Sequence, residues 1–343
     1  MGNNQNNRGT AYGDLPTGDR GGNLRRAIGC FEAALRISTE RDFPVQWAAT
    51  QNNLGVTYAH LPTRDRGENL RRAIGCFEAA LRVSTERNFP AQWAATQNNL
   101  GNAYRDFPMG DRGENLQRAV AYYEAALRVF TEQDFPVQWA ETQNNLGVAY
   151  RSLPTGDRGE NLRKAIACYE AALRVRTERD FPADWGRTQI NLGVAYRSLP
   201  TGDRGENLRR AVACYQAALR VFTEQDSPAQ WAMTQNNLGT VYADLPTGDR
   251  GENLLRAIAC YQAALRVRTE RNLPAEWAGT QNNLGTAYAD LPTGDRAENL
   301  RKAIACFENA LTVFTETEFP HYRSGTAANL ARAREQLQEL GEK

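Results

Sequence analysis

The chain has 343 residues, and its 41 lysine and arginine side chains nearly balance its 40 aspartate and glutamate side chains. This balance disfavours nucleic acid as a partner, because nucleic acid is bound largely by neutralising its phosphates. No apolar run reaches the roughly 20 residues that a membrane-spanning helix needs, and the first residues lack the apolar core of a signal peptide. We therefore expect a cytoplasmic protein that does not contact a membrane.

A six-residue motif recurs along the chain at a fixed spacing. The motif TQNNLG, written TQINLG in one copy, recurs at multiples of 46 residues, at Thr50, Thr96, Thr142, Thr188, Thr234 and Thr280. A period of about 20–50 residues indicates a solenoid of stacked repeats rather than separate cores. We expect a single solenoid over 1–343, divided into an incomplete first repeat (1–43), six full repeats (44–319) and a C-terminal capping helix (320–343).

Each repeat predicts two helices joined by short loops, as residues 44–89 illustrate. Pro44 suits the first turn of a first helix, because its missing N–H is not needed there, and Pro62 follows that helix. Asp65 is the expected N-cap of a second helix, and Glu68, three residues later, completes a capping-box pattern. All 14 prolines of the chain occupy these two kinds of position. The pattern therefore predicts antiparallel helix pairs throughout.

The chain contains 6 cysteines, which share one repeat position: Cys30, Cys76, Cys168, Cys214, Cys260 and Cys306. Equivalent positions in stacked repeats should lie about 10 Å or more apart, since packed helix axes are about 8–10 Å apart, whereas a disulfide needs Cα atoms within about 7 Å. The spacing matches no zinc site either. We expect buried thiols in a reducing compartment, with no metal and no cofactor.

Two other repeated features have a packing explanation. The GDRGEN loop does not match the pattern of a phosphate-binding loop, so we expect Arg66 and Asn69 to bond neighbouring loops. The tryptophan of each repeat, such as Trp47, is expected to pack between repeats rather than to stack on a ligand.

One repeat carries a family signature. LGVTY, which begins at Leu54, and the later AxxxFxxA, which begins at Ala73, together resemble the tetratricopeptide repeat. The period is longer than the family's usual period of about 34 residues, and Gln51 stands where the family has tryptophan. The long repeats are similar to arrays in bacterial multidomain proteins that join them to CHAT proteases or nucleotide-switch domains.

The resemblance implies an all-α, right-handed superhelical solenoid, with the first helices lining a concave groove and the second helices forming a convex face. In family members that bind extended peptides, an asparagine just before the L-G pair often bonds the peptide backbone. Here that position holds Asn53, Asn99, Asn145, Asn191, Asn237 and Asn283, and the preceding position holds Asn52, Asn98, Asn144, Asn236 and Asn282. The same side chains could instead bridge neighbouring first helices, and the sequence leaves both roles open.

Charged residues that vary between repeats are candidates for selectivity. Arg105, Arg151, Arg187 and Arg197 fall on the expected groove face, together with Asp106 and Glu141. Arginines bind carboxylates through charge-assisted bonds, so they favour an acidic segment or a free C-terminal carboxylate as the partner. The alternative is that these arginines pair with Asp106 or Glu141 and only solvate the surface.

The sequence contains no catalytic constellation. It has 2 histidines, His60 and His321, which are far apart, and no nucleophile elbow or dinucleotide fingerprint. We therefore expect a non-catalytic scaffold that binds a protein or peptide. Two alternatives remain: self-assembly into a homo-oligomer or filament, and RNA binding by a helical-repeat code, which the neutral charge and the long period disfavour.

Overall fold

The computed structural model describes residues 2–341. Position 1 of the predicted first repeat and positions 342–343 of the predicted capping helix lie outside the described residues. The described range contains helices and loops and no strand, which confirms the all-α class. The helices are α1 (Gly2–Asp14), α2 (Arg20–Ile37), α3 (Pro44–His60), α4 (Arg66–Leu81), α5 (Pro90–Asp106), α6 (Arg112–Ala126), α7 (Pro136–Ser152), α8 (Arg158–Val175), α9 (Pro182–Ser198), α10 (Arg204–Ala218), α11 (Pro228–Asp244), α12 (Arg250–Val267), α13 (Pro274–Asp290), α14 (Arg296–Val313) and α15 (Pro320–Gly341).

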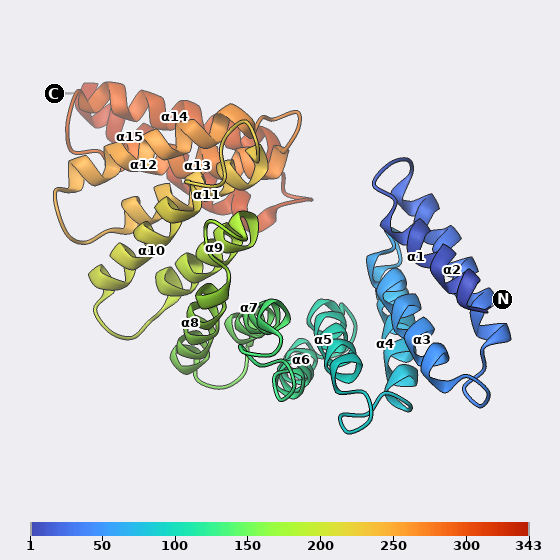
Figure 1. Cartoon of the computed structure of the whole chain (residues 1–343). Coiled ribbons are helices and arrows are strands. Elements are labelled where there is room, and N and C mark those ends of the chain that lie inside the picture. Colours follow the sequence, from blue (N-terminus) through green and yellow to red (C-terminus); the bar gives the residue numbers. More distant parts are fainter. Residues whose placement is uncertain (1, 342–343) are drawn as a thin grey trace. The chain divides into compact units, whose positions relative to one another are not determined.

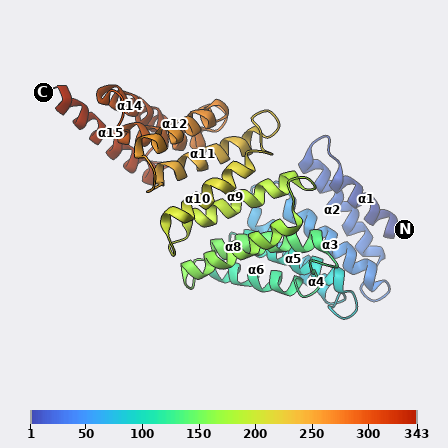
Figure 2. The same ribbon diagram turned by 60° about the vertical axis from the view of Figure 1, so that its left-hand side comes forward.

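The helices form consecutive pairs, and the chain divides into two compact units, Met1–Val175 with α1–α8 and Arg176–Lys343 with α9–α15. Within each unit, the two helices of a pair pack along each other, as α1 and α2 do in Figures 1 and 2. Each second helix also packs on the next first helix, and successive first helices touch. The expected stack of helix pairs is therefore present in both units.

Local signals explain where the helices begin and end. Pro44 occupies the first turn of α3, and the side chain of Asp65 caps α4 by accepting a hydrogen bond from the Glu68 backbone N–H at 2.9 Å. The Glu68 carboxylate accepts hydrogen bonds from Arg71 and Arg72. The predicted N-cap is thus confirmed, whereas the side chain of Glu68 serves ion pairs instead of the second half of a capping box.

A glycine in each first helix allows its paired second helix to approach closely. A Cβ atom at Gly101 would lie 2.5 Å from Cε1 of Tyr123, and one at Gly55 would lie 2.6 Å from Cε1 of Phe77. These rings are almost completely buried and belong to a core that also contains Leu70 and Leu116. Close packing of this kind leaves no room for an added methyl group.

A second repeated contact joins the tryptophan of a first helix, an arginine at the C-terminal end of the second helix, and a glutamate from the loop before the first helix. The Arg82 guanidinium lies 5.2 Å from the centre of the Trp47 ring and is 2.8 Å from the Glu40 carboxylate. The same arrangement recurs at Trp93, Trp139, Trp185 and Trp231. These tryptophans are buried between helices, which confirms the predicted packing role.

The structure corrects the prediction for the GDRGEN loop. Arg66 donates to the carbonyl oxygen of Ala59, near the end of its own first helix, and the six equivalent arginines make the same bond. The side-chain amide of Asn69 donates to the Leu61 carbonyl oxygen and the Thr63 hydroxyl. Asn69 therefore secures the loop of its own repeat. Arg66 bonds its own repeat and also lies 4.0 Å from the Asp106 carboxylate, at the end of the next first helix.

All six cysteines are free thiols, but the expectation that they are buried holds for only two of them. Cys214 and Cys306 are buried and the others are partly buried. Burial raises the pKa of Cys76, Cys260 and Cys306 to about 11, because a thiolate is poorly solvated in an apolar environment.

Candidate functional site

Two rows of asparagines lie along the first helices. We define the 52 row as Asn52, Asn98, Asn144, Asn236 and Asn282, and the 53 row as Asn53, Asn99, Asn145, Asn191, Asn237 and Asn283. Almost all of these side chains are half-buried, and Asn98 is buried with 8% exposure. The rows are therefore neither core nor fully solvated surface.

The rows bridge neighbouring first helices. The side-chain oxygen of Asn52 on α3 accepts a hydrogen bond from the Asn99 amide on α5 at 3.0 Å, and the Thr96 hydroxyl lies 3.3 Å from the same oxygen. The side-chain oxygen of Asn236 on α11 likewise accepts a hydrogen bond from the Asn283 amide on α13 at 3.4 Å. This is the bridging role that the sequence left open as an alternative to ligand binding.

Bridging uses only half of each carboxamide. In the 52 row the oxygen accepts, whereas for Asn52 and Asn236 no bond from the side-chain nitrogen is found within residues 2–341. In the 53 row the nitrogen of Asn99 and Asn283 donates. A carboxamide has two N–H donors and an acceptor oxygen with two lone pairs. Asn52 and Asn236 therefore retain donors, and Asn99 and Asn283 retain acceptors, the two groups that pair with a peptide unit.

Asn237 differs from its equivalents because its neighbouring acceptor is missing. The 52 row is interrupted by Ile190, a buried apolar side chain on α9. Over the described part of the chain, no hydrogen bond reaches the half-buried Asn237 side chain. Asn237 is therefore the member of the 53 row whose complete carboxamide is available.

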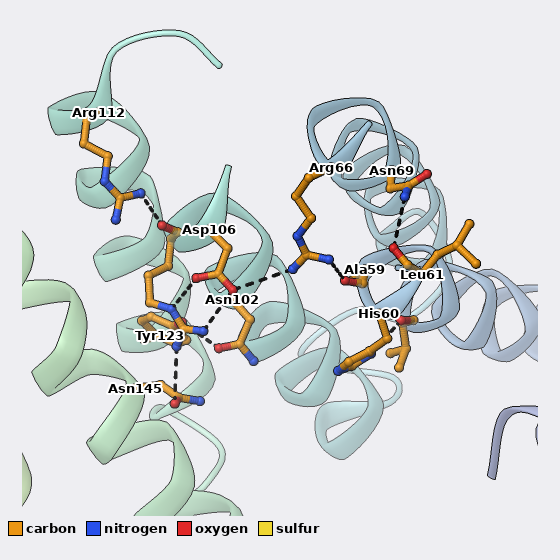
Figure 3. A network of polar contacts seen from close by, with 12 residues as sticks. Ala59, His60, Leu61, Arg66, Asn69, Asn102, Asp106, Arg112, Tyr123 and Asn145 are labelled. Carbon is orange, nitrogen blue, oxygen red and sulfur yellow. Dashed lines mark hydrogen bonds and ion pairs between the residues drawn. The ribbon is translucent and has the colours of Figure 1, made fainter. Parts of the chain in front are cut away.

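The candidate selectivity residues form ion pairs. Arg105 binds the Asp106 carboxylate through Nε at 2.9 Å and lies within 3.5 Å of both Tyr123 Oη and Asn145 Oδ1. Figure 3 shows this network, which also includes Arg66, whose guanidinium is 4.0 Å from Asp106. Burial acts to lower the pKa of Arg105, but its bonds to Asp106 and the facing Tyr123 outweigh burial and hold that pKa above its ordinary value.

The other three arginines are placed in different ways. Arg187 pairs with Asp184 one turn away, and Arg197 pairs with Asp244 at 3.5 Å. Arg151 is half-buried, and its Nε atom has no hydrogen-bond partner in the described residues. Glu141 lines a pocket with Arg105 and Asn145. Most of the expected arginine charge is thus already compensated by neighbouring carboxylates.

Three pockets occupy the same place between successive repeats. Their volumes are about 290, 220 and 380 Å³, and each is lined by an asparagine at the 53 position: Asn53, Asn99 and Asn329, respectively. The first arginine of a second helix lines each of them too, namely Arg20, Arg66 or Arg296. The asparagines therefore border hollows as well as bridging helices.

A fourth pocket, of about 250 Å³, lies between α3 and α5. Its lining includes Ala49, Phe89, Asn52 and Ser84. In three of the six other copies the position of Ser84 is occupied by a buried phenylalanine, at Phe130, Phe222 and Phe314. The small serine thus leaves open a space that an aromatic ring fills elsewhere. Sequence reasoning missed this pocket, although a comparison of equivalent positions contains the signal.

The described residues contain no helix that is long and apolar enough to cross a membrane. Between positions 2 and 341, no group of three or more histidine, cysteine, aspartate or glutamate side chains is placed to hold a metal ion.

Comparison with known proteins gives structural relatives only. No family model matches the sequence, and no curated protein matches it. RapI, solved without ligand, is 14% identical with a TM-score of 0.57, covering 95% of this chain and 89% of RapI. BtubC from P. vanneervenii is 22% identical with a TM-score of 0.53, covering 71% of this chain and 91% of BtubC.

A third relative is PH0952 from Pyrococcus horikoshii, described as a signal transduction ATPase with a tetratricopeptide repeat sensor. It is 14% identical with a TM-score of 0.53, and the match covers 96% of this chain and 51% of PH0952. These similarities agree with the LGVTY signature, the helix pairs and the fixed period. The chain has the tetratricopeptide-repeat fold, built from long repeats of 46 residues.

Proposed function

We propose that this chain is a non-catalytic protein-interaction scaffold that holds an extended protein segment along its first helices. The observation that carries the proposal is that, in the bridging asparagines, one part of the carboxamide bonds the neighbouring first helix and the other part does not. Bridging uses the oxygen of Asn52 and the nitrogen of Asn99, and Asn236 and Asn283 repeat it, which leaves donors on the first member of each pair and an acceptor on the second. An extended peptide presents both kinds of group along its backbone and can pair with them whatever its sequence.

Three further features support this function. The pockets beside Asn53, Asn99 and Asn329 offer space next to the rows for ligand side chains. The repeat unit of PH0952 is described as a sensor, which is a recognition role. The free thiols fit the reducing cytoplasm.

The test uses peptides selected against the folded chain from a random 15-residue display library. Affinities of the selected peptides are then measured for the wild type and for two single variants in the same unit. Asn237→Ala removes a first-helix carboxamide that has no hydrogen bond to lose in the described structure. Asn309→Ala is the matched control, because Asn309 is an exposed asparagine on the second helix α14.

A hydrogen bond is worth about 0.5–1.5 kcal/mol, so Asn237→Ala should weaken binding by roughly 2- to 12-fold for peptides that lie across α11, while Asn309→Ala leaves affinity unchanged. Equal affinities for both variants across all selected peptides would contradict the proposal. If only Asn309→Ala lowered the affinity of the selected peptides, the binding surface would lie on the second helices.

A further inference from the structure

We infer that the pocket between α13, α14 and α15 binds an oxyanion carried by the protein segment, either a carboxylate or a phosphate. This inference rests on the proposed function, which supplies the bound protein segment. It assigns the negatively charged group of that segment to one pocket. The pocket is the largest of the three equivalent pockets, at about 380 Å³.

Three guanidinium groups line this pocket. Arg250 is 3.7 Å from the Asp290 carboxylate, and Arg296 donates to the side-chain oxygen of Gln336 at 2.7 Å. Arg332 on α15 is exposed, and it has no ion pair or side-chain hydrogen bond within the described range. The lining therefore carries three positive charges and one negative charge, and Arg332 is the arginine whose guanidinium makes no bond within the described range.

The two equivalent pockets have balanced charge. The first contains Arg20 together with Asp14. The second contains Arg66 and Arg105 together with Asp106 and Glu141. The surplus of positive charge is therefore a property of the pocket at α15 and does not follow from the repeat architecture.

Substitutions at two repeat positions contribute to the difference. The position of Arg332 holds neutral residues in the other copies: Thr10, Val56, Asn102, Val148, Val194, Thr240 and Thr286. The position of Gln336 holds aspartate in four copies, Asp14, Asp106, Asp244 and Asp290, and a neutral residue in His60, Ser152 and Ser198. Arg332 adds a positive charge relative to both equivalent pockets, and Gln336 lacks the negative charge that Asp106 supplies in the second.

Arginine suits an oxyanion because its planar guanidinium can donate two parallel hydrogen bonds to a carboxylate or phosphate. The available groups come from three helices, so they can surround a ligand group rather than contact it from one side. Asn329, which is half-buried and without a hydrogen bond in the described residues, adds a neutral donor to the same lining. The ligand group is thus the side chain of an aspartate or glutamate, a C-terminal carboxylate, or a phosphorylated side chain.

The test titrates the full chain with blocked single residues and follows the arginine Nε–H signals by NMR. The probes are N-acetyl-aspartyl amide and N-acetyl-phosphoseryl amide, with N-acetyl-asparaginyl amide as the neutral probe. Arg332→Thr installs the residue found at Thr240 and Thr286, so it is compatible with the fold. Arg301→Gln removes an equal charge from an exposed position of α14 and is the matched control.

We expect saturable shifts of the Arg250, Arg296 and Arg332 signals with at least one anionic probe and none with the neutral probe. A hydrogen bond to a charged group is worth about 1.5–3 kcal/mol. Arg332→Thr should therefore lower the affinity for the anionic probe at least about tenfold, and Arg301→Gln should leave that affinity unchanged. The stronger anionic probe identifies carboxylate or phosphate. Absence of saturation, equal loss in both variants, or equal binding of the neutral probe would overturn the inference.

This experiment is independent of the peptide selection. Anion binding that depends on Arg332, combined with selected peptides that ignore Asn237→Ala, would sustain the pocket and reject the asparagine rows as the binding surface. The opposite combination would retain the scaffold and reject the pocket.

Discussion

The side-chain amide of Asn99 on α5 donates a 3.0 Å hydrogen bond to the side-chain oxygen of Asn52 on α3. Two residues that look like ligand-binding groups in the sequence are therefore also part of the contact between repeats. The bond holds each carboxamide in one orientation, so the unused donor of Asn52 and the unused acceptor of Asn99 are fixed in space. Because these side chains are already ordered, less conformational entropy is lost when a segment binds to them.

This bridging predicts that stability and binding can be separated by comparing an asparagine that bridges with one that does not. Asn52→Ala removes the acceptor shared by Asn99 and Thr96 and should destabilise the region by about 1–2 kcal/mol, whereas Asn237→Ala should change stability by less than about 0.5 kcal/mol. Repeat arrays need not unfold in one step, so amide hydrogen exchange of α3 and α5, and of α11, is the suitable measurement. Equal protection in both variants would argue against the bridge.

The last repeat lacks the arginine that covers tryptophan elsewhere. Thr312 replaces it, its hydroxyl donates to Glu270, and Trp277 is only partly buried. Thr312→Arg should place a guanidinium over Trp277 and raise stability by up to about 1 kcal/mol, seen as a higher thermal midpoint. The reverse change, Arg128→Thr, removes the cover from Trp93 and should lower the midpoint. A midpoint that Thr312→Arg leaves unchanged or lowers would contradict this account of the contact.

The pocket at Ser84 predicts opposite effects for two exchanges. Ser84→Phe supplies the ring that Phe130 provides in the next repeat and should raise the thermal midpoint by filling the space between α3 and α5. Phe130→Ser opens the corresponding space and should cost about 3–5 kcal/mol, as large-to-small changes in a core do. If Ser84→Phe instead lowered the midpoint by a comparable amount, the space would be too small or wrongly shaped for a ring.

Two glycines in neighbouring repeats should respond oppositely to alanine. Gly101→Ala places a methyl group against the buried ring of Tyr123 and should cost about 1–3 kcal/mol through overpacking. Gly75 in α4 has no atom near its Cβ position, and its equivalents Ala121, Ala167 and Ala213 are alanine. Gly75→Ala should therefore stabilise by about 0.5–1 kcal/mol. Urea midpoints of both variants measure this, and similar shifts in both would contradict the close helix contact.

The buried thiols predict a loss of stability at alkaline pH. An unfolded cysteine has a pKa of 9.0, and the folded pKa of Cys76, Cys260 and Cys306 is about 11. Between those values the unfolded chain loses protons that the folded chain keeps, so stability is complete below about pH 9 and falls as pH rises toward about 11. Replacing the three cysteines with alanine should flatten this slope in denaturation measured from pH 8 to 11. An unchanged slope would show that the thiols ionise equally in both states.

Much of the fold follows from the sequence because repetition averages out weak local signals. Proline at both ends of the first helix and aspartate at the start of the second define the helix pairs, and the structure has α3 beginning at Pro44 and α4 capped by Asp65. The tryptophan position is also predictable, since a large apolar side chain repeated at one position must be buried between repeats.

The polar contacts could be predicted less well. Glu68 belongs to a capping-box pattern, but Arg71 and Arg72 lie within reach on the same helix and compete for its carboxylate. Arg105 has Asp106 as its next neighbour in the chain, yet whether a long side chain turns to that carboxylate or to a ligand depends on packing around Tyr123. The charged pocket at α15 needs residues from three helices to be compared, which only the structure brings together.

The most direct test of the account is NMR of the side-chain amides in protein labelled with ¹⁵N only at asparagine, recorded with and without a selected peptide. Single alanine variants assign the signals. The account predicts that signals of the 52 and 53 rows, including Asn237, shift on binding, while those of Asn309 on α14 and of Asn69 on α4 do not. Shifts confined to Asn309, Asn69 and their equivalents, with both rows unchanged, would contradict the claim that the first helices hold the bound segment.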